Sequence, residues 1–234
     1  MPSTDKYRAH AIAAGILFII ATAFLFVGEA LYKPGLSPPN ILQKAANARS
    51  QISAGILIEF LCVLAIPLIP VVLYPILRLV SPVLAIGYVA FRLFEAALFA
   101  GMEITKILVL ALSKQVLANP STPSDGLELL ATALVGGDAW SGTSGPIYNL
   151  VFVSGMLMLN WMLWKSRLVP RWIAIWGMIS ALALGGIAVA VFFTTVSETI
   201  AIPLIAPLAI QEMVLALWFI FKGFDGEALA RLEG

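Results

Sequence analysis

Six apolar segments, each long enough to cross a lipid bilayer as a helix, constrain this chain more than any other feature. A helix needs about 20 apolar residues to span the hydrocarbon core. With 61% apolar and 12% charged residues, the chain departs from the roughly 45–50% apolar and 25% charged composition of soluble domains. We expect an all-α integral membrane bundle of six transmembrane helices, with residues 1–234 forming one domain. The segments cover residues 9–32, 52–77, 83–112, 145–164, 172–194 and 200–221.

Basic residues predict which way the bundle faces, because cytoplasmic loops are enriched in Lys and Arg. If the N-terminus is cytoplasmic, eight basic residues fall inside and four outside. Five of the six tryptophans also fall near the proposed inner interface, where Trp rings anchor helices. We therefore expect both termini in the cytoplasm. The inside residues are Lys6, Arg8, Arg78, Lys165, Arg167, Arg171, Lys222 and Arg231.

The two longest loops, Lys33–Ser50 and Ser113–Ser144, are too short to hold a separate soluble domain. Within the second loop, the stretch "PSDGLELLATALVGG" begins with Ser124 and Asp125 and ends in a Gly-Gly pair. Possible N-caps at the start and glycine at the end are typical of a short helix. An irregular loop is the alternative.

The residue inventory excludes several classes of function. The chain has a single histidine, His10. It therefore lacks the residues for Ser-His-Asp catalysis, for zinc bound by several histidines and for bis-histidine haem. We predict no catalytic residue, no metal site and no cofactor. A net charge of +1 provides no basic field that would attract nucleic acid. The single cysteine, Cys62, cannot form an intramolecular disulfide and is expected to be a small buried side chain.

The third segment is unusual because it carries four charges, Arg92, Glu95, Glu103 and Lys106. At about 100° per residue they share one helix face, with Tyr88 on the same stripe. A charge at the bilayer centre costs about 2.5–3.5 kcal/mol on insertion scales, so this face should turn toward the protein interior or water. The i,i+3 spacing lets Arg92 pair with Glu95 and Glu103 pair with Lys106.

Depth in the bilayer suggests partners on other helices. Glu59 is level with Lys106 in the outer third of the bilayer, and Glu212, next to Gln211, is nearer the cytoplasmic side, level with Arg92. We therefore expect a polar seam through the second, third and sixth segments. The candidate ligand- or ion-binding residues are Glu59, Tyr88, Arg92, Glu95, Glu103, Lys106, Gln211 and Glu212.

The deep charges of this seam do not balance, because four acids face two bases. A proton, a bound cation or water must relieve the surplus. Proline residues interrupt two segments, with Pro67, Pro70 and Pro75 in the second and Pro203 and Pro207 in the sixth. They indicate either ordinary kinks that help the bundle pack, or a hinge or discontinuous helix at a binding site.

Two C-terminal stretches carry a resemblance to a known family. They are "SRLVPRWIAIWGMI" (Ser166–Ile179) and "QEMVLALWFIFKGF" (Gln211–Phe224), and "FRLFEAAL" (Phe91–Leu98) in the third segment agrees with them. The chain resembles the domain of unknown function 4386 family of bacterial multi-pass membrane proteins over nearly its whole length. The resemblance implies a bacterial inner-membrane protein with about six spans. It implies no activity and no catalytic residue.

Three classes of function compete for the polar seam. We favour a non-catalytic binding, sensing or assembly protein, in which the seam holds a small polar or lipid ligand or locks the bundle. The alternative is a proton- or cation-coupled transporter that uses a surplus carboxylate as its ion site. An intramembrane enzyme has the least support, resting only on carboxylates able to act as acid and base. Apart from the lipid bilayer no partner is predicted, and the oligomeric state stays open.

The topology can be tested by accessibility labelling of single cysteines at Ser121 and Ser166 in a Cys62→Ala background. We expect a membrane-impermeant reagent to label the first position from outside and the second only from the cytoplasm. Labelling of both positions from one side would contradict the predicted orientation.

Overall fold

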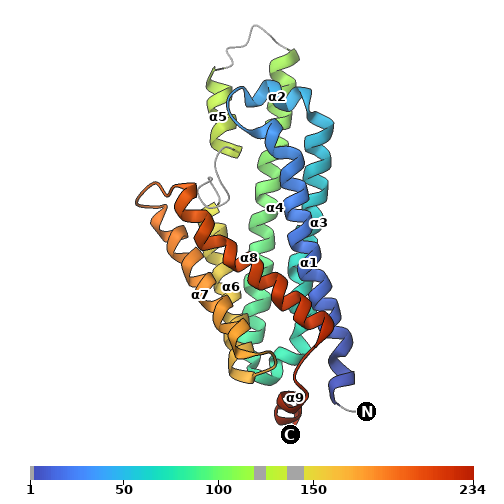
Figure 1. Cartoon of the computed structure of the whole chain (residues 1–234). Coiled ribbons are helices and arrows are strands. Elements are labelled where there is room, and N and C mark those ends of the chain that lie inside the picture. The colour runs from blue at the N-terminus through green and yellow to red at the C-terminus, as the bar shows by residue number, and fades with distance from the viewer. Residues whose placement is uncertain (1–2, 119–124, 136–144) are drawn as a thin grey trace.

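The structure, a computed structural model, describes residues 3–118, 125–135 and 145–234 (Figure 1). This part of the chain forms nine α-helices and no strand, which confirms the all-α prediction. The helices are α1 Ser3–Leu36, α2 Ile41–Asn47, α3 Arg49–Val80, α4 Pro82–Ala118, α5 Asp125–Val135, α6 Gly145–Ser166, α7 Arg171–Ala190, α8 Glu198–Phe221 and α9 Gly226–Glu233.

Six of these helices, α1, α3, α4, α6, α7 and α8, are long and apolar enough to cross a membrane. They correspond to the six predicted segments, and five of them contain the predicted range completely. Helix α7 is the exception, because it ends at Ala190, before the predicted end at Thr194. Helices α3 and α8 continue through their prolines, so neither is a discontinuous helix.

The six long helices form a closed ring. Each packs against the next in chain order, from α1 through α3, α4, α6 and α7 to α8, and α8 returns to α1. Figure 1 shows α1, α3 and α4 as a long group on one side, with α8 crossing obliquely in front. Both termini lie at the same end of the bundle, which we call the termini end, and α2 and α5 lie at the opposite end.

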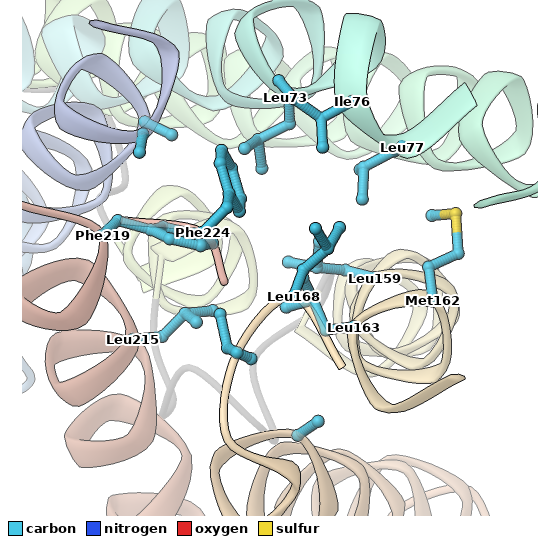
Figure 2. Packing of buried hydrophobic residues seen from close by; sticks show 14 of the residues in the cluster. Leu73, Ile76, Leu77, Leu159, Met162, Leu163, Leu168, Leu215, Phe219 and Phe224 are labelled. Atoms are coloured by element: carbon cyan, nitrogen blue, oxygen red, sulfur yellow. The ribbon is translucent and has the colours of Figure 1, made fainter. Parts of the chain in front are cut away.

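The largest apolar core fills the ring near the termini end (Figure 2). Leu73 and Ile76 of α3 face Leu159 of α6 and Phe219 of α8. Leu168, from the α6–α7 connection, also lies in this core. Because these side chains come from helices far apart in the sequence, their burial holds the two sides of the ring together.

Arg8 closes the ring between α1 and α8. Its guanidinium donates to the carbonyl oxygens of Phe219, at 3.1 Å, and Ile220, at 2.5 Å. The last carbonyl groups of a helix have no partner within the helix. Arg8, near the start of α1, therefore supplies hydrogen bonds to carbonyl groups at the end of α8. Lys6 and Glu233 add an exposed ion pair of 2.8 Å, and this hydrogen bond holds the pKa of the Glu233 carboxyl below its usual range.

Helix α5 agrees with the helical interpretation of the second loop. It begins at Asp125 and ends at Val135, whereas Ser124 and the Gly136-Gly137 pair lie outside the described residues. Glu128 of this helix accepts hydrogen bonds from the backbone amides of Ile41 and Leu42. A carboxylate of α5 therefore caps the N-terminus of α2.

Helices α2 and α9 were not predicted. Helix α2 buries Ile41, Leu42 and Ala45 in an apolar cluster with α4 and α5. At α9, the Asp225 side chain accepts from the amide of Ala228 at 2.8 Å. Both helices are short and depend on contacts with distant segments, which explains why their local sequence gave little signal.

Close packing of α1 on α3 depends on two glycines that face each other. A Cβ at Gly28 would lie 2.7 Å from the Glu59 Cβ and 2.9 Å from the Gly55 carbonyl oxygen. A Cβ at Gly55 would lie 2.8 Å from the Gly28 oxygen. Small residues of this kind let the backbones of membrane helices approach closely.

We expect Gly28→Ala to lower the free energy of unfolding by about 1–3 kcal/mol, because the added methyl group meets backbone atoms that cannot move away. Gly101→Ala in α4 is the control, since a Cβ there has no neighbour within 4 Å. Alanine is better than glycine inside a helix by roughly 0.5–1 kcal/mol, so the control should be neutral or stabilising. Reversible unfolding in mixed micelles measures both, and equal losses would contradict the close-packing argument.

Candidate functional site

The charged face of α4 is buried inside the bundle, as the helical periodicity predicts. Tyr88, Arg92, Glu95, Glu103 and Lys106 are all at most 7% exposed. A buried charge must be paired or hydrogen-bonded to be tolerated. The neighbouring helices therefore have to supply partners for this face.

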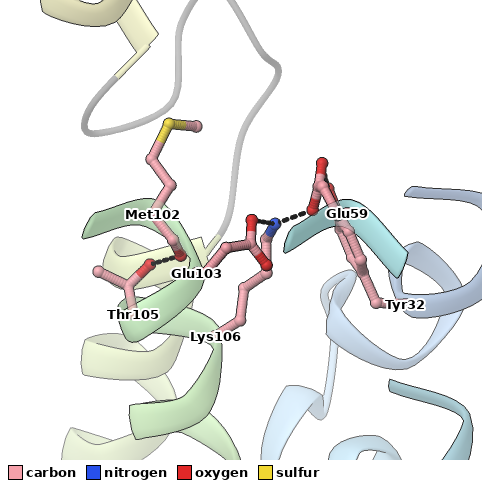
Figure 3. A network of polar contacts seen from close by, with 6 residues as sticks. All are labelled: Tyr32, Glu59, Met102, Glu103, Thr105 and Lys106. Carbon is pink, nitrogen blue, oxygen red and sulfur yellow. Dashed lines mark hydrogen bonds and ion pairs between the residues drawn. The ribbon is translucent and has the colours of Figure 1, made fainter. Parts of the chain in front are cut away.

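The first group of partners surrounds Lys106 (Figure 3). We use the name Lys106 cluster for Tyr32, Glu59, Glu103 and Lys106. The Lys106 ammonium pairs with Glu59 of α3 and, at 2.6 Å, with Glu103 of its own helix. The Tyr32 hydroxyl of α1 donates to Glu59 at 3.2 Å, and its ring lies 4.0 Å from the ammonium. The predicted pairings of Lys106 with Glu59 and with Glu103 are confirmed.

Most polar atoms of the Lys106 cluster are satisfied by the protein itself. The exception is Glu103 Oε2, which is buried without a hydrogen-bond partner in the described part of the chain. One cation shared by two carboxylates joins α3 to α4, and Tyr32 attaches α1 to the same point. This arrangement suits a structural role that fixes how three helices sit against one another.

The second group surrounds Arg92, and we use the name Arg92 cluster for Tyr88, Arg92, Glu95 and Tyr148. The Arg92 guanidinium contacts both oxygens of Glu95 through Nη1, at 3.0 and 3.2 Å, which confirms that predicted i,i+3 pair. Tyr148 of α6 donates to Glu95 at 3.4 Å. The guanidinium also lies 5.6 Å from the ring of Phe152, on α6, in cation–π geometry.

Unlike the Lys106 cluster, the Arg92 cluster has donors that no group in the described part of the chain accepts from. Arg92 Nε and the Tyr88 hydroxyl are both buried without a hydrogen-bond partner among the described residues. They lie one helical turn apart on α4, and both side chains pack over Gly155 of α6, where a Cβ would lie 3.6 Å from Arg92 Cδ and 3.7 Å from the Tyr88 ring. Unused donors in a dry interior are costly.

The predicted direct pairing of Arg92 with Glu212 is wrong. Arg92 forms its ion pair with Glu95, and no ion pair within the described residues includes Glu212. Glu212 lies on α8, is half-buried, and interacts with Arg92 and Glu95 only by longer-range electrostatics. Glu95 lies one turn away on the same helix and forms the ion pair with the guanidinium. The carboxyl group of Glu212 therefore has no ion-pair partner among the described residues.

The predicted polar seam through the second, third and sixth segments is interrupted. On α4, Ala96 and Phe99 lie between Glu95 and Glu103, and both are buried in an apolar cluster with Cys62 and Ile66 of α3. This apolar layer separates the Arg92 cluster from the Lys106 cluster. The deep charges therefore form two separate groups.

Gln211 belongs to neither cluster. It donates to the Asn160 side chain of α6 at 3.4 Å and to the Ile173 carbonyl oxygen of α7 at 3.2 Å. A Cβ at Gly177 would collide with Asn160, so this glycine provides the room for the amide between α6 and α7. Gln211 therefore links α8 to α6 and α7 by hydrogen bonds and is not part of the charged site on α4.

Sequence reasoning missed three residues of these polar groups: Tyr32, Tyr148 and Asn160. The two tyrosines lie near the ends of their apolar segments, where aromatic residues usually mark the membrane interface. Asn160 did carry a signal, because it is one of two asparagines, with Asn149, in an apolar segment, and it is fully buried. Intramembrane polar residues of this type point to interhelical hydrogen bonds.

Comparison with family models finds a match over residues 13–223 to the family described as Domain of unknown function (DUF4386). The chain belongs to this family. The match covers the stretches that carry the resemblance noted in the sequence, including the third span and both C-terminal motifs, except for Phe224, the last residue of the second. Searches of curated proteins and of solved structures found no match. Together with the six apolar helices, membership of DUF4386 indicates a multi-pass membrane protein of unknown function.

We expect Lys106→Met in this DUF4386 chain to lower the free energy of unfolding by roughly 3–5 kcal/mol, because two buried carboxylates would lose their shared cation. Adding Glu59→Met should recover only part of the loss, since Glu103 remains unpaired. The triple variant with Glu103→Gln should recover most of it, because no buried charge is left.

Reversible unfolding in mixed micelles measures these differences. Lys33→Met is the matched control, because Lys33 pairs with Glu29 at 2.8 Å while its side chain is 65% exposed, and exposed pairs contribute at most about 1 kcal/mol. A triple variant no more stable than Lys106→Met would show that the Lys106 cluster does not act as a structural ion-pair group.

Proposed function

We propose that this protein is a non-catalytic binding or sensing protein of the bacterial inner membrane, which holds a small polar ligand or lipid headgroup at the Arg92 cluster. One observation carries the proposal: Arg92 Nε and the Tyr88 hydroxyl are buried donors without a hydrogen-bond partner among the residues that the structure describes. Each such group costs about 1–3 kcal/mol when left unpaired. A ligand that accepts hydrogen bonds from both donors recovers this cost.

The charges around the Arg92 cluster define what kind of ligand fits. Arg92 and Glu95 neutralise each other, so the carboxyl group of Glu212 has no ion-pair partner among the described residues. A ligand with an acceptor group for Arg92 and Tyr88 and a cationic group for Glu212 complements both features. We therefore propose a zwitterionic ligand, such as an amino acid or an ethanolamine-type headgroup.

The apolar layer around Phe99 favours binding over transport. A conduction path along the charged face of α4 would have to cross Ala96, Phe99 and their apolar neighbours on α3. The closed Lys106 cluster lies beyond that layer. A binding site that opens from one side of the layer needs no such path.

A proton-coupled transporter is the second candidate, and Glu212 is the observation that favours it. A carboxylate in a membrane helix with no ion-pair partner is a typical proton-relay residue. In proteoliposomes loaded with a pH-sensitive dye, this candidate expects proton flux that Glu212→Gln abolishes. The binding function expects no flux from either protein.

The location and orientation belong to the same proposal. The excess of Lys and Arg in the segments at the termini end supports placing both termini in the cytoplasm. Lys6, Arg8 and Lys222 contribute to this excess. Under this orientation the Arg92 cluster lies about 15 Å from the cytoplasmic end of α4, counted at 1.5 Å per residue from Pro82.

The binding function predicts that Tyr88→Phe lowers the affinity for the ligand without lowering the stability of the ligand-free protein. Because the hydroxyl has no hydrogen-bond partner in residues 3–118, 125–135 and 145–234, its removal should leave the unfolding temperature of the ligand-free protein unchanged or higher. Affinity for a zwitterionic probe should fall roughly tenfold or more, since a hydrogen bond to a charged group is lost. Thermal shifts with a panel of amino acids, simple carboxylates and simple amines measure both quantities.

Tyr74→Phe is the matched control, because Tyr74 lies on α3 outside the Arg92 cluster. Glu212→Gln should weaken binding of the zwitterions and leave simple carboxylates unaffected. Equal stabilisation of the wild type and Tyr88→Phe by every compound that binds would contradict the proposed site.

A further inference from the structure

A cavity of about 490 Å³ opens at the termini end of the bundle, away from all three polar groups described above. Its walls come from the α6–α7 connection, the first residue of α7, the end of α8 and the α8–α9 connection. A hydrogen bond of 3.0 Å from the Asp225 amide to the Leu168 carbonyl oxygen ties the two connections together. The lining residues are Arg167, Leu168, Val169, Pro170, Arg171, Trp218, Lys222, Gly223, Phe224 and Asp225.

The side chains around this cavity are predominantly cationic. Arg167, Arg171 and Lys222 contribute three positive charges, against one carboxylate, that of Asp225. Asp225 is already engaged as the N-cap of α9, accepting from Ala228 at 2.8 Å. Arg171 lies over the ring of Trp164 at 5.5 Å, and among the described residues none of the three cations forms an ion pair. The cavity therefore presents uncompensated positive charge.

The backbone at Arg167 gives a second, independent indication. Arg167 follows the last residue of α6 and has a φ of 62°, in the left-handed region. Its amide donates to the Leu163 carbonyl oxygen at 3.1 Å, which is the usual left-handed helix end, a position where glycine is preferred. At the end of α8, the equivalent left-handed residue is Gly223, with a φ of 74°. An arginine at a glycine position, facing the cavity, indicates that the side chain itself is needed.

The surroundings of the cavity are those of a membrane interface. Phe221, next to Lys222, is 73% exposed, and Trp172, next to Arg171, is 54% exposed. Large apolar side chains that point outward beside cations are typical of the boundary between acyl chains and headgroups. A ligand in this cavity can therefore have its charged part among the cations while its apolar part stays in the bilayer.

We propose that this cavity binds the phosphate group of an anionic phospholipid in the leaflet at the termini end. Arg167, Arg171 and Lys222 neutralise the phosphate, and Trp218 forms the wall beside the headgroup. Basic pockets between membrane helices on the cytoplasmic side bind acidic headgroups in this way. The site is independent of the ligand proposed for the Arg92 cluster, so either assignment can fail without the other.

Titration of the full chain in detergent with short-chain phosphatidylglycerol tests the proposal, and the fluorescence of Trp218 and its neighbours reports binding. Arg167→Gly should bind about fivefold more weakly, and Arg167→Gly with Lys222→Gln roughly 25-fold, because each cation near a lipid surface contributes about 1 kcal/mol. The unfolding temperature of Arg167→Gly without lipid should be equal or higher, since glycine suits the left-handed backbone.

Arg78→Gln with Lys165→Gln is the control, because both residues are exposed cations of the termini end outside the cavity. Unchanged affinity in this control and loss in the cavity variants would support the site. Equal loss in both pairs would overturn it, because general surface charge would then explain the binding. Phosphatidylcholine and glycerol phosphate serve as comparison probes. Cavity-dependent binding of glycerol phosphate without binding of phosphatidylglycerol would overturn the lipid assignment and leave a soluble phosphate ester as the ligand.

Discussion

Lys106 places one positive charge between two carboxylates inside the bundle, and the mutual arrangement of α1, α3 and α4 depends on it. No water hydrates a charge that is buried in the hydrocarbon region, so the rotation and depth of each helix are restricted to those that keep Lys106 in contact with both carboxylates. Apolar packing alone tolerates sliding between neighbouring ridges. The shared ammonium, together with the Tyr32 hydroxyl, specifies how α1, α3 and α4 are positioned along one another. Gly28 and Gly55 then let the backbones of α1 and α3 approach closely in that position.

The two clusters on α4 show that similar residues can have different roles. Both contain an i,i+3 acid–base pair and a tyrosine from a neighbouring helix. In the Lys106 cluster the third charged group, Glu59, contacts the cation directly, whereas Glu212 stays at a distance from Arg92. Among the described residues, the Lys106 cluster is left with one buried oxygen without a partner, Glu103 Oε2, whereas the Arg92 cluster has two buried donors without a partner and, nearby, a carboxyl group outside any ion pair. Buried donors without a partner among the described residues, rather than the ion pairs themselves, therefore mark the Arg92 cluster as the candidate site.

Much of this fold follows from simple properties of the sequence. The length and apolarity of the segments predicted the six long helices. The rotation of about 100° per helical residue placed the charges of α4 on one face, and the cost of charge in a membrane predicted that this face is buried. Depth matching found the partner of Lys106, but it failed for Arg92, because equal depth says nothing about the lateral distance between α4 and α8. Helix α2 was beyond local reasoning, since its N-terminus is capped by Glu128, which lies far along the chain.

The closed ring has a consequence for the order in which the protein is assembled. Five of the six contacts around the ring join helices that follow one another in the chain, so each new helix can pack as soon as it enters the membrane. The sixth contact, between α1 and α8, forms only after the last span has been inserted and Arg8 can reach the end of α8. The cavity between the α6–α7 and α8–α9 connections is completed at that late step as well. A lipid phosphate that binds there would recognise only chains in which all six long helices have been inserted, and would thereby favour the closed ring over its open precursors.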